Sequence, residues 1–146
     1  MPTVTSTITR LWLADNLPIR GGLYRADGST RAVRLDTSMP GGLALLQPFD
    51  LEAWLLANPE WQTCIITTIE LPLPDGSGYL CCGEGSYGSE GFFARLDQNK
   101  TLVWVVYLED SNPFVDAAIH GPHSTIRSSS GLSISVDLTS PDFRPD

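Results

Sequence analysis

Long apolar runs are missing from this 146-residue sequence. A helix that spans a membrane needs about 20 consecutive apolar residues, and no run in the chain approaches that length. An export signal would place basic residues ahead of a long apolar segment, and the opening MPTVTSTITRLWLADN has no such arrangement. We therefore expect a cytoplasmic protein that does not interact with membranes.

Basic residues are also scarce. The chain has nine Lys and Arg against 17 Asp and Glu, and its net charge at pH 7 is −8. The imbalance lies after residue 36, where four basic residues stand against fourteen acidic ones. A surface this negative repels nucleic acid and anionic lipid and attracts basic proteins. The charge therefore predicts a basic protein partner and argues against nucleic-acid binding.

Cysteine occurs only three times, an odd number that fits a cytoplasmic location. Cys81 and Cys82 are adjacent in a predicted strand, so their side chains point to opposite faces, and Cys64 lies far from them in sequence. Most buried cysteines are merely packed, and we interpret these in the same way. The alternative is that Cys82, which lies beside a glycine-rich loop, is a nucleophile.

What the sequence does contain is a strong strand signal, concentrated in residues 78–113. The segment Leu102–Leu108, LVWVVYL, is apolar throughout and rich in β-branched and aromatic residues, which is typical of a strand buried on both faces. Phe92–Leu96 precedes it, and the polar residues 97–100 between the two have the length of a hairpin connection. The sequence therefore predicts an antiparallel hairpin that other elements must cover.

Strand signals also occur elsewhere in the chain. Asp27-Gly28, between the alternating segments 23–25 and 30–35, predicts a second hairpin. Residues 132–138 alternate between apolar and polar, which indicates a strand with one face in the core and one in water. Further strands are predicted at residues 3–14, 63–71, 114–120 and 124–128.

One segment, Pro48–Ala57, has the pattern of a helix. Asp50 can cap its N-terminus, and Trp54 and Leu55 share a face with Leu51. About nine short strands and this single short helix predict a mainly β fold, an antiparallel sandwich or open barrel. We expect one domain over residues 1–146, because the length suits a single core, with a flexible tail at residues 140–146.

The segment Gly83–Gly88 reads GEGSYG and matches the pattern G-x-G-x-x-G. It resembles the glycine loop of protein kinases, but Glu90 replaces the apolar residue of that loop, and the only lysine, Lys100, lies in a turn. A dinucleotide-binding loop would have to open a helix, whereas a hairpin is predicted here. We therefore interpret these glycines as positions that allow tight bends between strands.

Histidine and cysteine could form reactive groups in two ways. His120 and His123 could bind a metal ion with Asp116 as a third ligand, but proline between the histidines favours a simple turn. Cys82 could use the same imidazoles and Asp116 as a nucleophile set, although no local signature accompanies it. We expect no metal, no cofactor and no catalytic activity.

Carboxylates lie in two clusters, one in the glycine loop and one directly after residue 108. Either cluster could provide the carboxylate pair of a glycosidase, Glu84 with Glu90 or Glu109 with Asp110. We favour a contact surface, because tyrosine is enriched in interfaces and negative charge speeds encounter with a basic protein. The residues predicted to bind the partner are Glu84, Tyr87, Glu90, Glu109 and Asp110, with Trp61 and Tyr107 as further aromatic anchors.

A resemblance to a known class of proteins rests on three segments in the C-terminal half of the chain: GEGSYGSEGFFARLD, LVWVVYLEDSNPF and SGLSISVDL. In these segments the chain resembles the small, acidic, β-rich immunity proteins that bacteria encode beside polymorphic or contact-dependent toxins. The resemblance is one of type and transfers no individual site residue. It implies a cytoplasmic protein without catalysis that binds a cognate toxin domain and blocks its active site or substrate groove.

Two other classes of function stay open. A small-ligand or carbohydrate-binding β-sandwich, or a hydrolase with a carboxylate pair, would have a deep pocket lined by Glu84, Glu90 and aromatic residues. A structural subunit of a larger assembly would have a long unpaired edge strand and would associate with itself.

Overall fold

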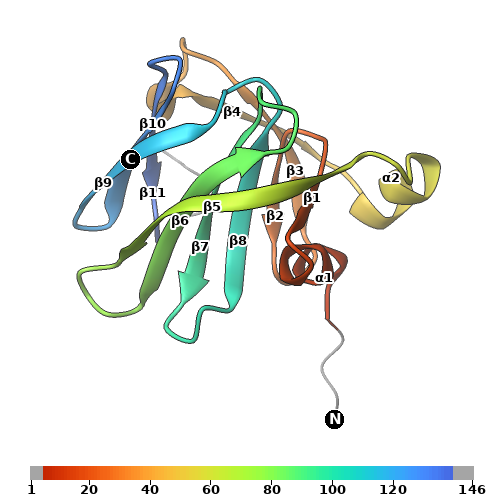
Figure 1. Ribbon diagram of the computed structural model, residues 1–146, viewed down its shortest axis with the longest axis horizontal. Coiled ribbons are helices and arrows are strands. Elements are labelled where there is room, and N and C mark those ends of the chain that lie inside the picture. The colour runs from red at the N-terminus through yellow and green to blue at the C-terminus, as the bar shows by residue number, and fades with distance from the viewer. Residues whose placement is uncertain (1–4, 140–146) are drawn as a thin grey trace.

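The centre of the fold is the predicted hairpin of β7 (Gly91–Asp97) and β8 (Leu102–Leu108). The computed structural model describes residues 5–139, and in it the two strands pair antiparallel, with Phe92 opposite Tyr107 (Figure 1). Their connection is a tight turn in which the Asp97 carboxylate accepts hydrogen bonds from the backbone N–H groups of Asn99 and Thr101, at 2.8 and 2.9 Å. The sequence prediction of this hairpin is confirmed.

This hairpin is part of an eight-stranded antiparallel sheet with the strand order β1-β5-β6-β7-β8-β2-β3-β4. The strands on either side of it are β1 (Asn16–Pro18), β5 (Gln62–Pro72) and β6 (Gly78–Gly85) on one flank and β2 (Gly22–Arg25), β3 (Thr30–Leu35) and β4 (Leu43–Pro48) on the other. β2 and β3 form the second predicted hairpin, with Gly28 in the turn at φ 98°.

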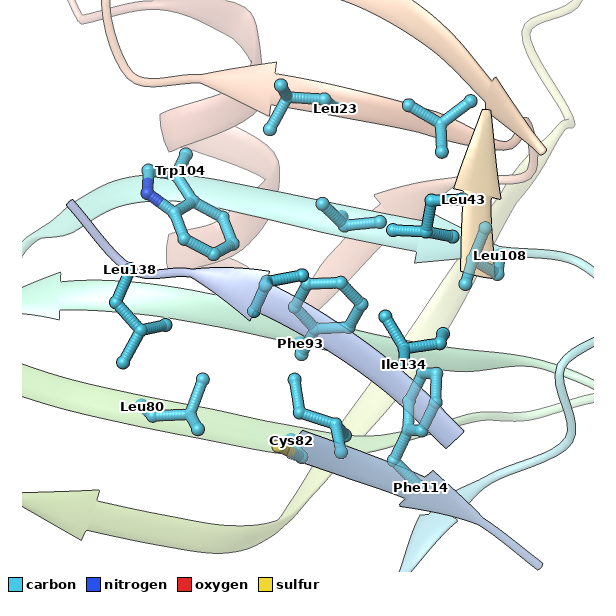
Figure 2. Close-up of a cluster of buried hydrophobic side chains, with 14 of the residues drawn as sticks. Leu23, Leu43, Leu80, Cys82, Phe93, Trp104, Leu108, Phe114, Ile134 and Leu138 are labelled. Carbon is cyan, nitrogen blue, oxygen red and sulfur yellow. The ribbon is translucent and has the colours of Figure 1, made fainter. Parts of the chain in front are cut away.

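A smaller antiparallel sheet, in the order β11-β10-β9, packs against one face of the large sheet (Figure 1). Its strands are β9 (Phe114–His120), β10 (His123–Ser128) and β11 (Ser133–Asp137). β11 buries Ile134 and Val136 and exposes Ser133 and Ser135, as its alternating sequence predicts. Figure 2 shows side chains of both sheets meeting between them in the first hydrophobic core, around Phe93.

Two short helices cover the other face of the large sheet, α1 (Thr7–Leu13) and α2 (Leu51–Ala57). They bury Ile8 and Leu51 in a second hydrophobic core that also contains Tyr24, Phe92 and Tyr107. β8 contributes to both cores, with alternate residues on opposite faces of the sheet. This position explains why its sequence is apolar at every residue rather than at every second one.

Residues 3–14 were predicted to form a strand, and this prediction is wrong. Residues 7–13 form α1, which Ser6 caps by accepting a hydrogen bond from the backbone N–H of Thr9 at 3.3 Å. Ile8 and Trp12 are four residues apart and therefore share one face of the helix. Ile8 is buried, and the Trp12 ring meets the Phe92 ring edge-on at 5.8 Å. Thr and Ile suggested a strand, but packing follows the helical spacing.

The expected numbers of strands and helices also change. Residues 5–139 contain eleven strands and two α-helices, with a short 3₁₀ turn at Pro40–Gly42, whereas about nine strands and one helix were predicted. The additional strands include β1, which lies in a segment read as a turn, and β4. The predicted helix begins at Leu51 rather than at Pro48, which ends β4, and Asp50 caps it as expected, at 3.1 Å from the backbone nitrogen of Ala53. The predicted flexible tail, residues 140–146, lies outside the described residues.

The mainly β, antiparallel architecture is confirmed, and the described strands do not close into a barrel. One opening lies along β5, because β1 pairs only with Gln62–Cys64. Within residues 5–139, no strand pairs with the outer edge of β5 from Ile66 to Pro72, although β9 lies close to β5 and the Thr68 hydroxyl donates a hydrogen bond to the Phe114 carbonyl at 3.4 Å. Neither described α-helix has the length and apolar character of a membrane span.

Candidate functional site

An open hollow with a volume of about 480 Å³ lies at one end of the large sheet. Four segments meet there: the end of β8, the β6–β7 loop, the link after β1 and the link between α2 and β5 (Figure 1). The residues that line it are Ile19, Glu60, Trp61, Tyr87, Ser89, Glu90, Tyr107 and Glu109. The lining therefore combines apolar and aromatic side chains with three glutamates and contains no basic residue.

Glu90 forms the floor of the hollow and is 2% exposed. Its Oε2 accepts a hydrogen bond from the Tyr107 hydroxyl, and its Oε1 accepts one from the backbone N–H of Tyr87 at 2.9 Å. The Thr63 hydroxyl also lies 3.2 Å from Oε1, and it accepts a hydrogen bond from the Ser86 backbone N–H at 3.1 Å. Hydrogen-bond donors on β8, on β5 and in the β6–β7 loop thus converge on one buried carboxyl group. This network holds the β6–β7 loop in place.

Two buried tyrosines, Tyr24 and Tyr107, belong to the second core, and Tyr107 also lines the hollow. Burial raises the pKa of the Tyr107 hydroxyl well above its ordinary value, and the hydrogen bond to Glu90 raises it further. Burial likewise raises the pKa of Tyr24, whose hydroxyl donates a hydrogen bond to the Arg20 carbonyl at 2.5 Å. Both phenols therefore keep their protons at neutral pH and act as hydrogen-bond donors.

The glycine-rich loop has a structural reason for its composition. A β-carbon at Gly85 would overlap the carboxyl group of Glu90, and one at Gly83 would overlap the backbone carbonyl of Ile66. Gly88 has a φ of 88° in the open part of the loop, a conformation that other residues rarely adopt. The prediction that these glycines serve tight backbone geometry is consistent with this arrangement, and Gly85 in particular leaves room for Glu90.

The rim of the hollow is anchored by backbone contacts. Glu109 Oε1 accepts a hydrogen bond from the backbone N–H of Gly21 at 3.2 Å. Ser89 donates a hydrogen bond from its hydroxyl to the Glu109 carbonyl at 3.1 Å, and its own carbonyl accepts one from the Asn112 backbone N–H at 2.9 Å. These contacts tie the β6–β7 loop to the end of β8, so the hollow is formed before any ligand arrives.

Two large aromatic side chains stand exposed at this rim. Tyr87 is 68% exposed and Trp61 is 52% exposed. Burying an aromatic side chain stabilises a fold, and these two rings do not contribute that free energy in the isolated protein. Trp61 is held from behind by Trp54, whose ring meets it edge-on with centroids 6.3 Å apart. Exposed, braced aromatic rings of this kind are typical of binding surfaces.

The structure brings three of the five predicted contact residues together, because Tyr87, Glu90 and Glu109 all line the hollow. Glu84 lies on β6 and does not line it. Asp110 is exposed and faces a neighbouring depression that Arg20 and Arg34 also line.

Two of the predicted residues have to be corrected. Glu90 was expected to offer a surface charge, but its carboxyl group is buried and already accepts hydrogen bonds. Tyr107 was expected as an aromatic anchor of the interface, but it belongs to the second core and is fully buried. Both residues support the site from beneath and do not form its outer surface.

Sequence reasoning missed Glu60 and Thr63, which join the site through the fold. Glu60 follows the Asn58-Pro59 stop of α2, next to Trp61, and its exposure in that turn could have been inferred. Thr63 is in the first part of β5, and nothing in the sequence links it to Glu90, 27 positions away. Only the pairing of β5 with β6 brings the two together.

The other reactive groupings considered from the sequence are not assembled in the structure. Cys82 is buried in the first core, and burial raises its pKa to about 12, so its thiol is protonated at neutral pH and is a poor nucleophile. Cys81 has a pKa raised to about 12, by burial and by the nearby Glu70. His120 and His123 are exposed at a hairpin end, and within residues 5–139 no three His, Cys, Asp or Glu side chains group as metal ligands.

Comparisons of the chain with protein-family models, with curated proteins and with solved structures found no match.

Proposed function

We propose that this protein is a non-catalytic binding protein whose hollow, with the rim residues Trp61, Tyr87, Glu60 and Glu109, binds a basic protein. We further propose that the partner is a bacterial toxin domain, which the protein neutralises in the cytoplasm by direct contact. The class of partner comes from the acidic balance of the chain and from the resemblance to immunity proteins.

The observation that carries the proposal is the composition of the rim. Trp61 and Tyr87 leave large aromatic surfaces exposed, and Glu60 and Glu109 line the same hollow, which no basic residue lines. Glu109 also lines the neighbouring depression, together with Arg20 and Arg34. Aromatic residues in a preformed depression provide most of the binding energy in many interfaces. Carboxylates around them favour a positively charged partner and speed its approach.

The buried groups beneath the rim support a binding role over a catalytic one. The two oxygens of Glu90 already accept hydrogen bonds from Tyr107 and from the Tyr87 backbone. Tyr107 keeps its proton because burial and Glu90 raise its pKa. A general acid or base must exchange its proton with a substrate near the working pH, and this pair is arranged to hold one in place.

The test uses the purified products of the genes that adjoin this one and measures their binding by calorimetry. We expect a basic toxin domain to bind the wild-type protein and to bind the double variant Glu60→Gln/Glu109→Gln more weakly. Glutamine keeps the carbonyl oxygen that accepts the Gly21 hydrogen bond, so the rim geometry is preserved. Failure of every neighbouring product to bind, or equal binding by the double variant, would remove the proposal.

A matched control makes the same change in net charge at two residues that do not line the hollow. Glu52 on α2 and Asp116 on β9 are exposed and do not line the hollow. The variant Glu52→Gln/Asp116→Asn should bind the partner like wild type at ordinary salt. If it weakened binding as much as the rim variant, the effect would be one of net charge and not of this surface.

A second candidate function is binding of a small ligand or carbohydrate. The volume of about 480 Å³ falls within the range of small-molecule sites, and Trp61 and Tyr87 could stack on a sugar ring. The hollow is open and Glu84 lies outside it, so only part of the arrangement expected for a carboxylate-pair hydrolase is present. Titration with neutral monosaccharides and disaccharides, followed by NMR, would show whether sugars bind at the hollow.

A further inference from the structure

The hollow has a composition that selects one kind of side chain. Glu60 and Glu109 line it together with the exposed rings of Trp61 and Tyr87. Aromatic faces attract cations, and carboxylates pair with them, so the two kinds of wall favour the same ligand. A neutral side chain would interact favourably with the rings alone. An acidic side chain would be repelled by the glutamates.

The chemistry of the lining favours a planar, weakly hydrated cation. A guanidinium group is planar and weakly hydrated, stacks on aromatic faces and can donate to two acceptors at once. Lysine carries a compact, strongly hydrated charge that loses more on leaving water. The floor beneath the rim is already satisfied, because Glu90 accepts from Tyr107 and from the Tyr87 backbone, so the ligand pairs with rim groups.

The protein contains an arginine in a comparable setting. The Arg20 guanidinium carbon lies 3.8 Å from the centre of the Phe49 ring and 5.8 Å from that of Trp54. Trp54 is also the residue that braces Trp61 at the rim. The fold thus already places a guanidinium group on the aromatic cluster that continues into the hollow.

We infer that the hollow is a receptor for a single arginine side chain of the partner protein, stacked on Trp61 or Tyr87 and paired with Glu60 and Glu109. This inference rests on the proposed function, since it names the group by which the basic partner is recognised. It makes the hollow the anchor point of the interface and leaves the surrounding surface to supply complementarity.

The test titrates ¹⁵N-labelled protein with N-acetyl-arginine amide and follows the Trp61 indole and the Tyr87 and Gly21 backbone signals by NMR. We expect a dissociation constant on the order of 1 mM, with the largest shifts at these three groups. N-acetyl-citrulline amide, which has nearly the same shape without the charge, should cause no comparable shifts. N-acetyl-lysine amide should bind more weakly than the arginine probe.

Variants then distinguish the contribution of the carboxylates from that of the aromatic rings. Removing one carboxylate, by Glu60→Gln or Glu109→Gln, should weaken the arginine probe by about two- to fivefold, as expected for an exposed ion pair. Trp61→Ala should weaken it without a change in charge, and the control Glu52→Gln/Asp116→Asn should leave it unchanged. Equal binding of citrulline or lysine, or shifts centred elsewhere on the protein, would overturn the inference.

The two proposals fail in different ways. If a neighbouring gene product binds in a manner that depends on the rim while the arginine probe does not bind there, the arginine inference is wrong and the proposed function stands. If the probe binds the hollow but no neighbouring product does, the proposed function is wrong. Alanine scanning of the partner's arginines adds a direct check, because one of them should account for a large share of the affinity.

Discussion

The hydroxyl of Tyr107 donates its hydrogen bond to Glu90 Oε2, and both side chains are shut off from water. They come from β8 and from the loop before β7, so one bond joins the central hairpin to the floor of the hollow. A buried carboxyl group is costly unless its oxygens are satisfied. The stability of the fold and the shape of the candidate site therefore depend on the same contact.

Replacing Tyr107 with phenylalanine should destabilise the protein. The variant keeps the ring in the core but leaves Glu90 Oε2 without the donor it has in the wild type. An unsatisfied buried acceptor costs about 1–3 kcal/mol, and urea unfolding measures the loss. Tyr79→Phe is the control, because within the described residues the Tyr79 hydroxyl makes no hydrogen bond, and it should change stability by less than about 0.5 kcal/mol. Equal effects of the two variants would contradict the importance of the Glu90 contact.

Replacing Gly85 with alanine should also destabilise the protein, by about 1–3 kcal/mol, because the new methyl group overlaps the Glu90 carboxyl group. The same substitution in a Glu90→Ala background should cost much less, since the overlapping atoms are gone. A double-mutant cycle by chemical denaturation gives this coupling directly. A cost that does not depend on residue 90 would mean that backbone strain, and not the carboxyl group, requires glycine.

The free energy of unfolding should fall as pH rises above about 10, the ordinary pKa of tyrosine. Burial raises the pKa of Tyr24 far above that value, so the folded chain holds a proton that the unfolded chain has lost. This stabilisation is complete below pH 10 and decreases as pH rises between the unfolded and folded pKa values. Tyr24→Phe should therefore reduce the slope by about 1.4 kcal/mol per pH unit in denaturant titrations.

Cys81 and Cys82 titrate in the same alkaline range, with pKa values raised to about 12, so they contribute to the slope of both proteins compared. The difference between wild type and Tyr24→Phe isolates the tyrosine. Identical slopes would show that Tyr24 ionises as readily in the folded chain as in the unfolded one.

The three thiols should react in two groups with a chromogenic disulfide reagent at neutral pH. Cys64 is exposed and should react in the native protein, whereas Cys81 and Cys82 are buried. Their reaction requires unfolding, which makes it slower by about a thousandfold or more for a protein with about 5 kcal/mol of stability. Cys64→Ser should abolish the fast phase. Rapid modification of Cys82 in that variant would contradict its place in the core.

The sequence predicted the elements whose signal is local. The hairpin of residues 92–108, the Asp27-Gly28 turn, the Asp50 cap and the alternating strand at 133–137 each follow from chemistry within a few residues. Residues 7–13 were misread because β-branched residues outweighed the helical spacing of Ile8 and Trp12. The helical spacing of these two residues stabilises a helix only when their shared face packs against the sheet.

The candidate site was predicted in part for the same reason. Tyr87 and Glu109 are polar or aromatic residues in loops, and their exposure could be inferred from the turns around them. The burial of Glu90 could not, because its donors come from β8, from the start of β5 and from its own loop. A long-range hydrogen-bond network leaves no pattern in the sequence near the carboxylate that it surrounds.

The unpaired edge of β5 has a consequence for how this protein behaves in concentrated solution. From Ile66 to Ile69 that margin carries no charge, and Ile66 is 63% exposed, so two molecules could join their backbones along it in antiparallel fashion. Mutual repulsion between molecules with a net charge of −8 opposes such pairing. Dissolved salt shortens the reach of that repulsion to about 8 Å at physiological strength. The negative charge of the chain thus also opposes self-association. Because salt screens this repulsion, oligomers should form first in high-salt preparations.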